Sequence, residues 1–283
     1  MASKFDAEAL ELHRSHHGKL AVTPTVPIAT RDDLSRAYTP GVAAPCLAIK
    51  ENPAKIYDYT TKGNMVAVVT NGTAVLGLGN IGAGAGLPVM EGKSILFKGF
   101  AGVDSVPVCV NSPKVEDVVK VCQLIAPTYG GINLEDIKAP QCFDIENELK
   151  KTLDIPVFHD DQHGTAIVVV SALLNAYKYL DRDLRTAKIV INGAGAAGQA
   201  IARLLFAYGI KTVVLCDTTG AVYEGRTENM NPYKESLAKV SNRQKEKGGL
   251  AQIIKGKDIF IGVSAPGSLT QDMIKSMSKD PVI

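Results

Sequence analysis

Short hydrophobic runs separated by glycines and polar residues fill the first half of the chain, and runs of this length are typical of buried strands. Between residues 64 and 111 they read MVAVVT, AVLGLG, ILFKGF and VPVCV, and a further strand is predicted in YGGINLEDI. Helical spacing of apolar positions is found at residues 5–17, 114–126 and 141–151. Residues 20–50 are rich in proline and predict loops. This half of the chain therefore predicts a mixed α/β domain.

The second half alternates more regularly between strand and helix patterns. A long apolar helix is predicted at about residues 164–180, followed by the strands KIVIN (188–192), TVVLCD (212–217) and DIFIGVS. Such alternation indicates a parallel, doubly wound sheet. The polar run at 242–247 predicts a solvated face. The last residues, DPVI, begin another apolar strand, so we expect this sheet to be incomplete at its C-terminal end.

A glycine-rich turn, INGAGAAG, follows the strand at 188–192 and opens a helix. Its glycines have the G-x-G-x-x-G spacing of dinucleotide-binding turns, in which the backbone approaches a pyrophosphate that rests on the helix N-terminus. The next strand ends in Asp217, whose carboxylate is placed to accept from a ribose hydroxyl. We therefore predict bound NAD, with NADP as the alternative. The predicted cofactor-binding residues are Gly193, Ala194, Gly195, Ala196, Ala197, Gly198 and Asp217.

Asp217 favours NAD because the 2′-phosphate of NADP would meet a carboxylate. Thr218 and Thr219 are not basic, but Arg226 or a nearby lysine would weaken this preference by folding back. A second glycine-rich stretch, at 77–86, lacks a helical pattern after it and predicts close backbone packing or a substrate loop.

These patterns predict an N-terminal domain at residues 1–162 and a Rossmann-type NAD(P)-binding domain at 163–283, within the α/β class. Hydrophobic residues make up 46% of the 283 residues, and the net charge of +2 excludes strong attraction to nucleic acid or anionic membranes. The five cysteines are dispersed, which indicates a reducing compartment. Without a signal peptide or a membrane-length apolar run, we predict a cytoplasmic protein.

Two acidic pairs follow strand-like segments: Glu135 with Asp136 in INLEDI, and Asp160 with Asp161 in VFHDDQ. Because parallel strands end at one edge of a sheet, the pairs are expected to converge, and carboxylates suit Mg²⁺ or Mn²⁺. Alternatively, Asp161 and Asp136 each cap the helix that follows. The pattern alone leaves both interpretations open.

Five long motifs occur in order along the chain: YTPGVAAPCLAI, TNGTAVLGLGNIGAGAGLPVMEGKSILFK, GGINLEDIKAP, VFHDDQHGTA and the glycine-rich turn. Together they resemble the malic enzymes of the shorter, prokaryotic type, over nearly the whole chain. The resemblance implies oxidation of L-malate with NAD(P), followed by decarboxylation to pyruvate and CO₂. It also implies that Glu135, Asp136 and Asp161 bind Mg²⁺ or Mn²⁺, and that the protein is a homodimer.

The resemblance further assigns catalytic roles. Lys93 is implied as the general base on the malate hydroxyl, Tyr38 as the proton donor to C3 of enolpyruvate, and Asp160 as a partner of Lys93 beside the metal. In a dimer, Tyr38 of one subunit is a candidate to enter the active site of the other subunit. Without the resemblance, Lys93 would be interpreted as a solvated lysine in a glycine-rich loop. Tyr38 would likewise be interpreted as an aromatic ring packed on the Pro40 turn.

The sequence departs from the family in two places. Longer members carry a substrate-binding arginine before LGLG where this chain has Ala74, and the family's asparagine–proline motif beyond PVI lies outside the chain. His159 and His163 are expected to form hydrogen bonds near the site. Two alternatives remain: a malolactic-type enzyme that converts malate to lactate without net redox change, and an inactive nucleotide-binding fragment.

Overall fold

The computed structural model describes residues 4–75 and 77–283 and divides into two compact units. The first unit comprises Met1–Ile137 and Ile145–Phe158, and the second comprises Lys138–Asp144 and His159–Ile283. None of the helices within the described residues is long and apolar enough to span a membrane.

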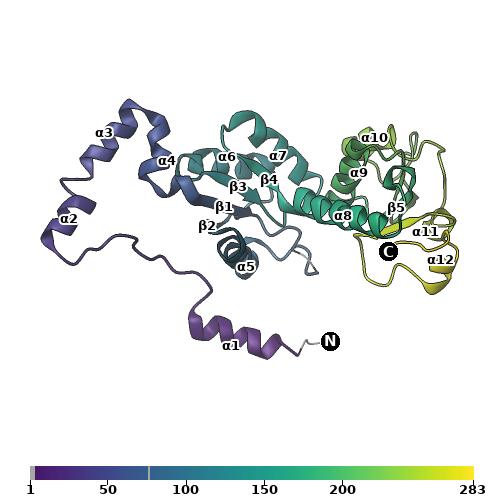
Figure 1. Ribbon diagram of the computed structural model, residues 1–283, viewed down its shortest axis with the longest axis horizontal. Helices are drawn as coiled ribbons and strands as arrows, with labels where there is room; N and C mark the ends of the chain where they lie inside the picture. The colour runs from purple at the N-terminus through teal and green to yellow at the C-terminus, as the bar shows by residue number, and fades with distance from the viewer. Residues whose placement is uncertain (1–3, 76) are drawn as a thin grey trace. The chain divides into compact units, whose positions relative to one another are not determined.

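The first unit is built on a four-stranded sheet in the order β2-β1-β3-β4 (Figure 1). The central strand β1 pairs in parallel with both β2 and β3. Its residues Ala67, Val68 and Val69 are completely buried, as expected for a parallel strand covered on both faces. The strands are β1 (Met65–Thr70), β2 (Asp104–Cys109), β3 (Gly131–Leu134) and β4 (Val157–His159).

Helices connect these strands as crossovers: α5 joins β1 to β2, α6 joins β2 to β3, and α7 joins β3 to β4. In Figure 1, α5 lies on one side of the sheet and α6 and α7 lie on the other. The α-helices are α1 (Asp6–His16), α2 (Arg31–Ala37), α3 (Ala43–Glu51), α4 (Ile56–Tyr59), α5 (Ala83–Ala101), α6 (Val115–Ile125) and α7 (Gln141–Thr152). Short 3-10 helices occur at η1 (Pro53–Lys55), η2 (Thr61–Asn64) and η3 (Ala126–Thr128).

Two of the strands predicted in this unit are wrong. The run ILFKGF lies inside α5, and the described residues of AVLGLG form a loop. The buried positions of α5 are Ala83, Gly86, Met90 and Ser94, a helical stripe that begins before the apolar run. The stretch at 77–86 therefore leads into a helix, because α5 begins within it at Ala83. A short apolar run fits a strand and a helix equally well, which explains the error.

The second unit contains the sheet β7-β6-β5-β8, in which β5 pairs in parallel with β6 and β8. The two-residue β7 is antiparallel to β6. The predicted ranges of β5 and β6 are confirmed. The strands are β5 (Lys188–Asn192), β6 (Thr212–Asp217), β7 (Gly220–Ala221) and β8 (Ile259–Gly262).

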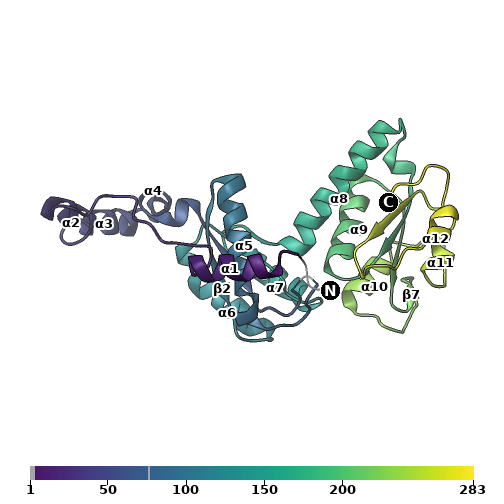
Figure 2. The same cartoon turned by 90° about the horizontal axis from the view of Figure 1, so that it is seen from below.

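Both faces of this sheet are buried. Ile189 and Ile191 pack with Ile201 and Leu205 of α9, whereas Val190 belongs to a separate cluster on the opposite face. Figure 2 shows α8 and α9 side by side on one face and α11 and α12 on the other, which is the doubly wound arrangement. The helices are α8 (Asp160–Tyr179), η4 (Leu184–Thr186), α9 (Ala196–Tyr208), α10 (Pro232–Ala238), α11 (Leu250–Ile253) and α12 (Gln271–Lys275).

Three details differ from or extend the predicted second domain. α8 begins at Asp160, four residues before the predicted start, since 164 − 160 = 4. Val282 forms a parallel bridge with Ile259, so the final residues extend the sheet beside β8 as expected. The run 242–247 is not simply a solvated face, because Asn242 is buried and Glu246 forms an ion pair with the buried Lys257.

Candidate active site and nucleotide site

Two buried carboxylates follow directly from the end of β3. Glu135 and Asp136 are only 6% and 3% exposed. Asp136 has a φ of 53°, in the left-handed region that side chains other than glycine rarely adopt, so the chain turns sharply here. The backbone N–H of Ala74 donates to the carbonyl of Asp136 at 3.0 Å. The glycine-rich loop after β1 is thereby attached to the acidic pair.

Lys93 lies in α5, and its Nζ is 3.2 Å from Oε1 of Glu135. The interpretation as a solvated loop lysine is therefore wrong. Nδ2 of Asn133 donates to the other oxygen of Glu135 at 2.8 Å. Asn133 is fully buried and absent from the predicted site, although a polar residue inside the apolar strand GINL signals a partner to be satisfied.

The second acidic pair follows β4, which is the neighbour of β3 in the same sheet. Nε2 of His159, which is fully buried, lies 3.0 Å from Oδ2 of Asp161. Asp160 and Asp161 form the first turn of α8, where the helix dipole favours negative charge. The N-cap position belongs to His159 and carries no side-chain cap, so Asp161 does not cap this helix.

Gly164 makes room for the Asp160 carboxylate. A Cβ atom at Gly164 would lie 2.2 Å from Oδ1 of Asp160, closer than nonbonded atoms approach. Any larger side chain at this position would displace the carboxylate, so the glycine in HDDQHG leaves the space that Asp160 occupies.

Glu135, Asp136 and Asp161 each place one carboxylate oxygen within 4.8 Å of the others. All three residues follow the ends of the neighbouring strands β3 and β4. Three hard oxygen donors at this spacing fit Mg²⁺ or Mn²⁺, which complete their coordination with water or substrate oxygens. The donor set therefore fits the metal ion that the family resemblance implies.

Tyr38 lies just after α2 and is 71% exposed. Its ring is therefore not packed into a turn, contrary to the simpler interpretation of this residue. Within the described part of the chain, its hydroxyl forms no hydrogen bond with a protein group, and the structure does not bring it to Lys93.

The glycine-rich turn after β5 divides into two tight positions and one open position. A Cβ atom at Gly193 would lie 2.5 Å from the carbonyl oxygen of Val263, and one at Gly198 would lie 1.8 Å from that of Gly193. A Cβ atom at Gly195, by contrast, would have no neighbour within 4 Å among the described residues. The outer glycines thus serve the packing of the protein, while the middle glycine leaves space where a pyrophosphate would approach the N-terminus of α9.

A pocket of about 690 Å³ opens beside this turn, within the usual range for a small-molecule site. Its lining includes Gly195, Asp217 at the end of β6, and Ser264 after β8. The predicted glycine-rich residues and Asp217 therefore line one pocket or flank it.

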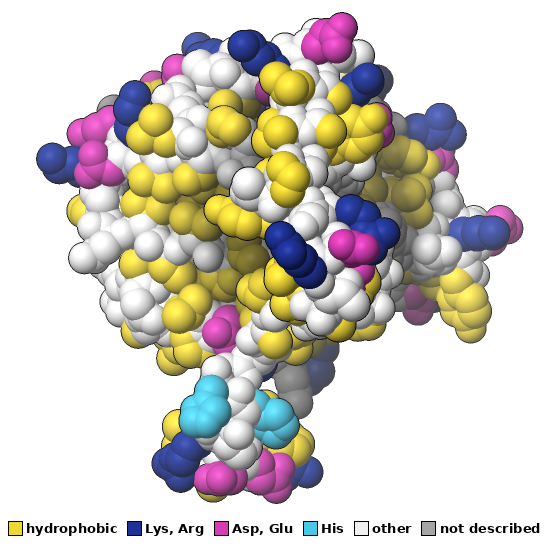
Figure 3. Space-filling model, turned by 90° about the vertical axis from the view of Figure 1, so that its left-hand side faces the viewer, with side chains coloured by type: hydrophobic (Ala, Val, Ile, Leu, Met, Phe, Trp, Pro, Cys, Tyr) yellow, Lys and Arg dark blue, Asp and Glu magenta, His cyan; other side chains and the backbone are white. Residues whose placement is uncertain are grey.

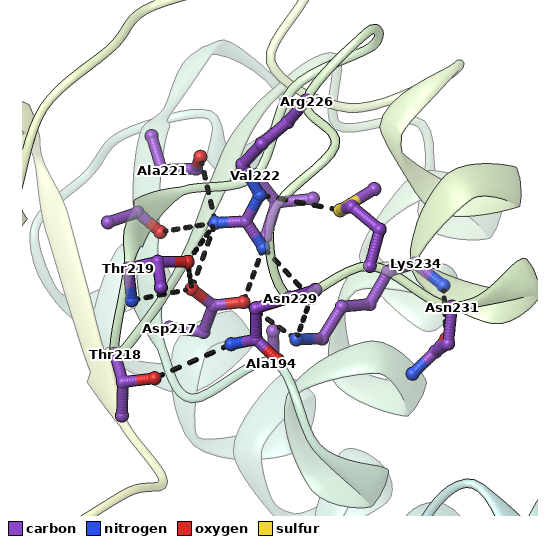
Figure 4. A network of polar contacts seen from close by, with 12 residues as sticks. Ala194, Asp217, Thr218, Thr219, Ala221, Val222, Arg226, Asn229, Asn231 and Lys234 are labelled. Carbon is purple, nitrogen blue, oxygen red and sulfur yellow. Dashed lines mark hydrogen bonds and ion pairs between the residues drawn. The ribbon is translucent and has the colours of Figure 1, made fainter.

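Asp217 is held by two cations (Figure 4). Nη1 of Arg226 donates to Oδ1 at 2.9 Å, and Nζ of Lys234 donates to Oδ2 at 2.7 Å. The hydroxyl and N–H of Thr219 also donate to Oδ1. Burial by itself raises the pKa of Asp217, but the hydrogen bonds from Arg226, Lys234 and Thr219 outweigh it and hold the pKa below its ordinary value.

This network changes the predicted basis of cofactor choice. The acceptor positions of Asp217 are already occupied, and one acid beside two bases leaves a net charge of +1 (+2 − 1). The sequence identifies Arg226 or a nearby lysine as a group that would fold back on Asp217, and the structure places both Arg226 and Lys234 there. The electrostatic argument against a 2′-phosphate is therefore weaker than an unpaired aspartate would make it.

Comparisons with known proteins match both units. Family models described as the N-terminal domain and the NAD-binding domain of malic enzyme match residues 17–114 and 162–283. A bifunctional malic/malolactic enzyme of Bacillus subtilis is 56% identical over 276 residues, covering 98% of this chain and 67% of that enzyme. An NADP-dependent malic enzyme of Rhizobium meliloti is 51% identical and covers 100% of this chain and 37% of that enzyme.

A solved structure, the NAD-dependent malic enzyme of Thermotoga maritima, matches with a TM-score of 0.93 and 45% identity. The match covers 97% of this chain and 73% of that chain. The chain thus spans between 37% and 67% of the length of the two curated relatives.

Replacing the outer and middle glycines should have different effects. Gly198→Ala should lower the free energy of unfolding by about 2 kcal/mol, because its Cβ overlaps the Gly193 carbonyl. Gly195→Ala should leave stability unchanged and weaken NADH binding roughly tenfold, because its Cβ enters only the open space. Urea denaturation and NADH titration measure the two effects. Unchanged NADH affinity in Gly195→Ala would contradict the assigned pyrophosphate position.

Asp217→Asn should destabilise the second unit by about 3 kcal/mol, since two buried cations lose their counter-charge. Because the native pKa of Asp217 lies below its ordinary value of 3.8, this stabilisation is present above that pH and is lost as the pH falls through the native pKa. Denaturation midpoints between neutral and acidic pH measure the difference. The control is Asp183→Asn, which removes one partner of the exposed ion pair with Arg185 and should leave the denaturation midpoint nearly unchanged. Equal effects of the two variants on the midpoint would refute the prediction.

Proposed function

The chain belongs to the malic enzyme family, and we propose that it catalyses the oxidative decarboxylation of L-malate to pyruvate and CO₂ with reduction of NAD(P). The observation that carries this proposal is the placement of Lys93 against Glu135, which itself belongs to a cluster of three carboxylates. Glu135 therefore contacts the candidate base, Lys93, and also belongs to the candidate metal site. The glycine-rich pocket of the second unit supplies a site for the hydride acceptor.

The cluster of Glu135, Asp136 and Asp161 would hold Mg²⁺ or Mn²⁺. When bound, the ion would make the malate hydroxyl easier to deprotonate and stabilise negative charge that develops during decarboxylation. Asn133 orients Glu135 through a hydrogen bond before any ligand arrives, and the ring of His159 lies 3.0 Å from the second oxygen of Asp161.

Lys93 would accept the proton of the hydroxyl group on C2 of malate. The pocket beside the glycine-rich turn would hold the NAD(P) that supplies the hydride acceptor. Glu135, whose Oε1 lies 3.2 Å from Nζ, keeps the amine beside the carboxylate cluster. Asp160, whose position depends on Gly164, is proposed to hold Lys93 in place. Loss of CO₂ leaves an enolate, whose C3 would take a proton from Tyr38.

The N-terminal helices support a homodimer. No residue of α1, α2 or α3 is buried, and hydrophobic side chains stand open over a broad area of the face shown in Figure 3. Exposed apolar surface of this extent marks an interaction site. We propose that a second copy of the chain covers it and that Tyr38 completes the site of its partner. The exposed residues include Val26, Ile28, Leu34, Tyr38 and Leu47.

NAD is the proposed cofactor, and NADP is proposed to be accepted as well. Arg226 and Lys234 already stand where a 2′-phosphate would need cations, although Asp217 neutralises one of them. The relatives named above include an NADP-dependent enzyme, and the similar solved structure is of an NAD-dependent one. A cytoplasmic location is supported by the five cysteines, none of which forms a disulfide bond within the described residues.

A malolactic reaction is the second candidate, favoured by the bifunctional name of the Bacillus subtilis relative. The same carboxylates, lysine and nucleotide pocket would serve it, with the hydride returned to the product. The products of malate turnover distinguish the two reactions.

Purified protein supplied with malate, NAD and Mn²⁺ should form NADH and pyruvate in equal amounts. Absorbance of NADH and enzymatic determination of pyruvate and lactate measure this stoichiometry. Lactate without NADH would replace the proposed function by the malolactic one, and no turnover at all would support an inactive fragment.

Lys93→Met should reduce malate oxidation by about 10² to 10⁴, because the general base is lost, while Mn²⁺ binding persists. Asp161→Asn should weaken Mn²⁺ binding itself. Manganese titration by electron paramagnetic resonance, together with steady-state rates, separates the roles. Lys98→Met is the matched control, since Lys98 lies on the same helix but pairs with Asp104 in solvent. Normal malate oxidation by Lys93→Met would remove Lys93 from the mechanism.

The chain should sediment as a dimer, and Leu47→Arg should shift it toward the monomer by placing a charge in the contact surface. Leu124→Arg, equally exposed but located on α6, is the control and should leave the dimer intact. A monomeric wild-type protein at micromolar concentration would contradict the proposed assembly.

A further inference from the structure

Asn192 is the last residue of β5, immediately before the glycine-rich turn, and it is only 8% exposed. Its Nδ2 donates to the hydroxyl oxygens of Ser264 at 2.8 Å and of Ser268 at 2.9 Å. Both serines belong to the loop that follows β8, and all three residues line the nucleotide pocket. The two hydrogens of one buried amide group are thus used to hold two hydroxyl groups.

The direction of these hydrogen bonds leaves both serines with a donor to spare. A hydroxyl group has one hydrogen and two acceptor positions, and each serine oxygen accepts from Asn192. Neither hydroxyl donates to a protein acceptor within residues 4–75 and 77–283. Ser264 is exposed and Ser268 is half-buried, so the two O–H groups are available to a molecule in the pocket.

The surrounding loop is fixed at both ends. The N–H of Val263 donates to the carbonyl of Asn192 at 2.9 Å, and the Val263 carbonyl packs closely against Gly193. At the other end, the Thr270 side chain caps α12. A hydroxyl pair on a loop held in this way is pre-organised, which reduces the entropy lost when a ligand binds.

The strand order places this pair opposite Asp217. β6, which carries Asp217, lies on one side of β5, and β8 lies on the other. In a sheet of this type a dinucleotide spans the point where the strand order reverses, with one nucleotide on each side of the glycine-rich turn. Asp217 faces the adenosine ribose, so the serines face the nicotinamide nucleotide.

We propose that Ser264 and Ser268, oriented by Asn192, donate hydrogen bonds to the ribose hydroxyl oxygens of the nicotinamide half of the cofactor. The proposal rests on the proposed NAD(P)-dependent function and deepens it. Asn192 is a positioning residue, and the two serines bind the cofactor. They fix the ribose that carries the reacting ring and so contribute to the orientation of the nicotinamide.

The test compares NADH, ADP-ribose and ADP as probes of the full chain. ADP-ribose keeps the second ribose but lacks nicotinamide, and ADP lacks both. Ser264→Ala and Ser268→Ala should each weaken NADH and ADP-ribose about threefold to tenfold, with ADP unchanged. The chain contains no tryptophan, so NADH fluorescence reports binding without energy transfer from indole, and calorimetry measures the other two probes.

Three further variants sharpen the comparison. Ser264→Thr keeps the hydroxyl and should retain most of the affinity. Ser278→Ala removes a serine hydroxyl that donates to Asp258, away from the pocket, and should change no affinity. In Asn192→Asp the carboxylate would accept from both serines and turn their hydrogens away. It should therefore weaken ADP-ribose more than ADP, whereas its added charge alone would weaken both equally.

The outcomes distinguish this proposal from the proposed function. Wild-type protein that binds none of the three probes would overturn the NAD(P)-dependent function itself. Wild-type binding with unchanged affinities in both serine variants would overturn only the serine assignment. Loss of NADH affinity with unchanged ADP-ribose affinity would also overturn it, because the serines would then contact the nicotinamide group rather than the ribose.

Discussion

Two neighbouring buried carboxylates at the end of β3 are the constraint on which the first unit depends. Glu135 and Asp136 would each lose several kcal/mol of hydration on burial if they lacked compensating partners. The fold supplies an ammonium group from α5 and an amide from β3 to Glu135, and it attaches the loop after β1 to the backbone of Asp136. The connection from β1 to β2 therefore does more than cover the sheet, because it brings the compensating charge.

The second unit also buries charged side chains, but there the positive charges outnumber the negative ones. Asp217 is one acid between two bases, and all three side chains are at most 10% exposed. Around Glu135, by contrast, the three carboxylates outnumber the one lysine. The two clusters thus differ in the sign of their excess charge, negative where a cation is expected and positive where a phosphate-bearing cofactor is expected.

Much of this arrangement follows from local sequence patterns. The strands KIVIN and TVVLCD are found where their apolar runs predict them. The spacing of the glycines identifies the tight turn between them because Gly193 and Gly198 each answer a local steric need. The run ILFKGF misleads because its hydrophobic residues do not reveal which face is buried. Lys234 lies 17 residues from Asp217, so the sequence does not single it out among the nearby lysines. Asn133 does carry a local signal, because a polar residue inside an apolar strand needs a buried partner. The roles of Tyr38, Lys93 and Asp160 remain predictions of the family resemblance.

The cation pair beside Asp217 also has an evolutionary consequence. A protein that must gain a preference for a phosphorylated cofactor usually has to introduce positive charge into a folded pocket, where an unpaired charge is destabilising. Here both cations are already buried and satisfied by Asp217 and neighbouring carbonyl groups. Replacing Asp217 would leave both cations available to a phosphate group. The limit on such a change in cofactor preference is therefore the loss of stability on removing Asp217, because no new binding residue is needed.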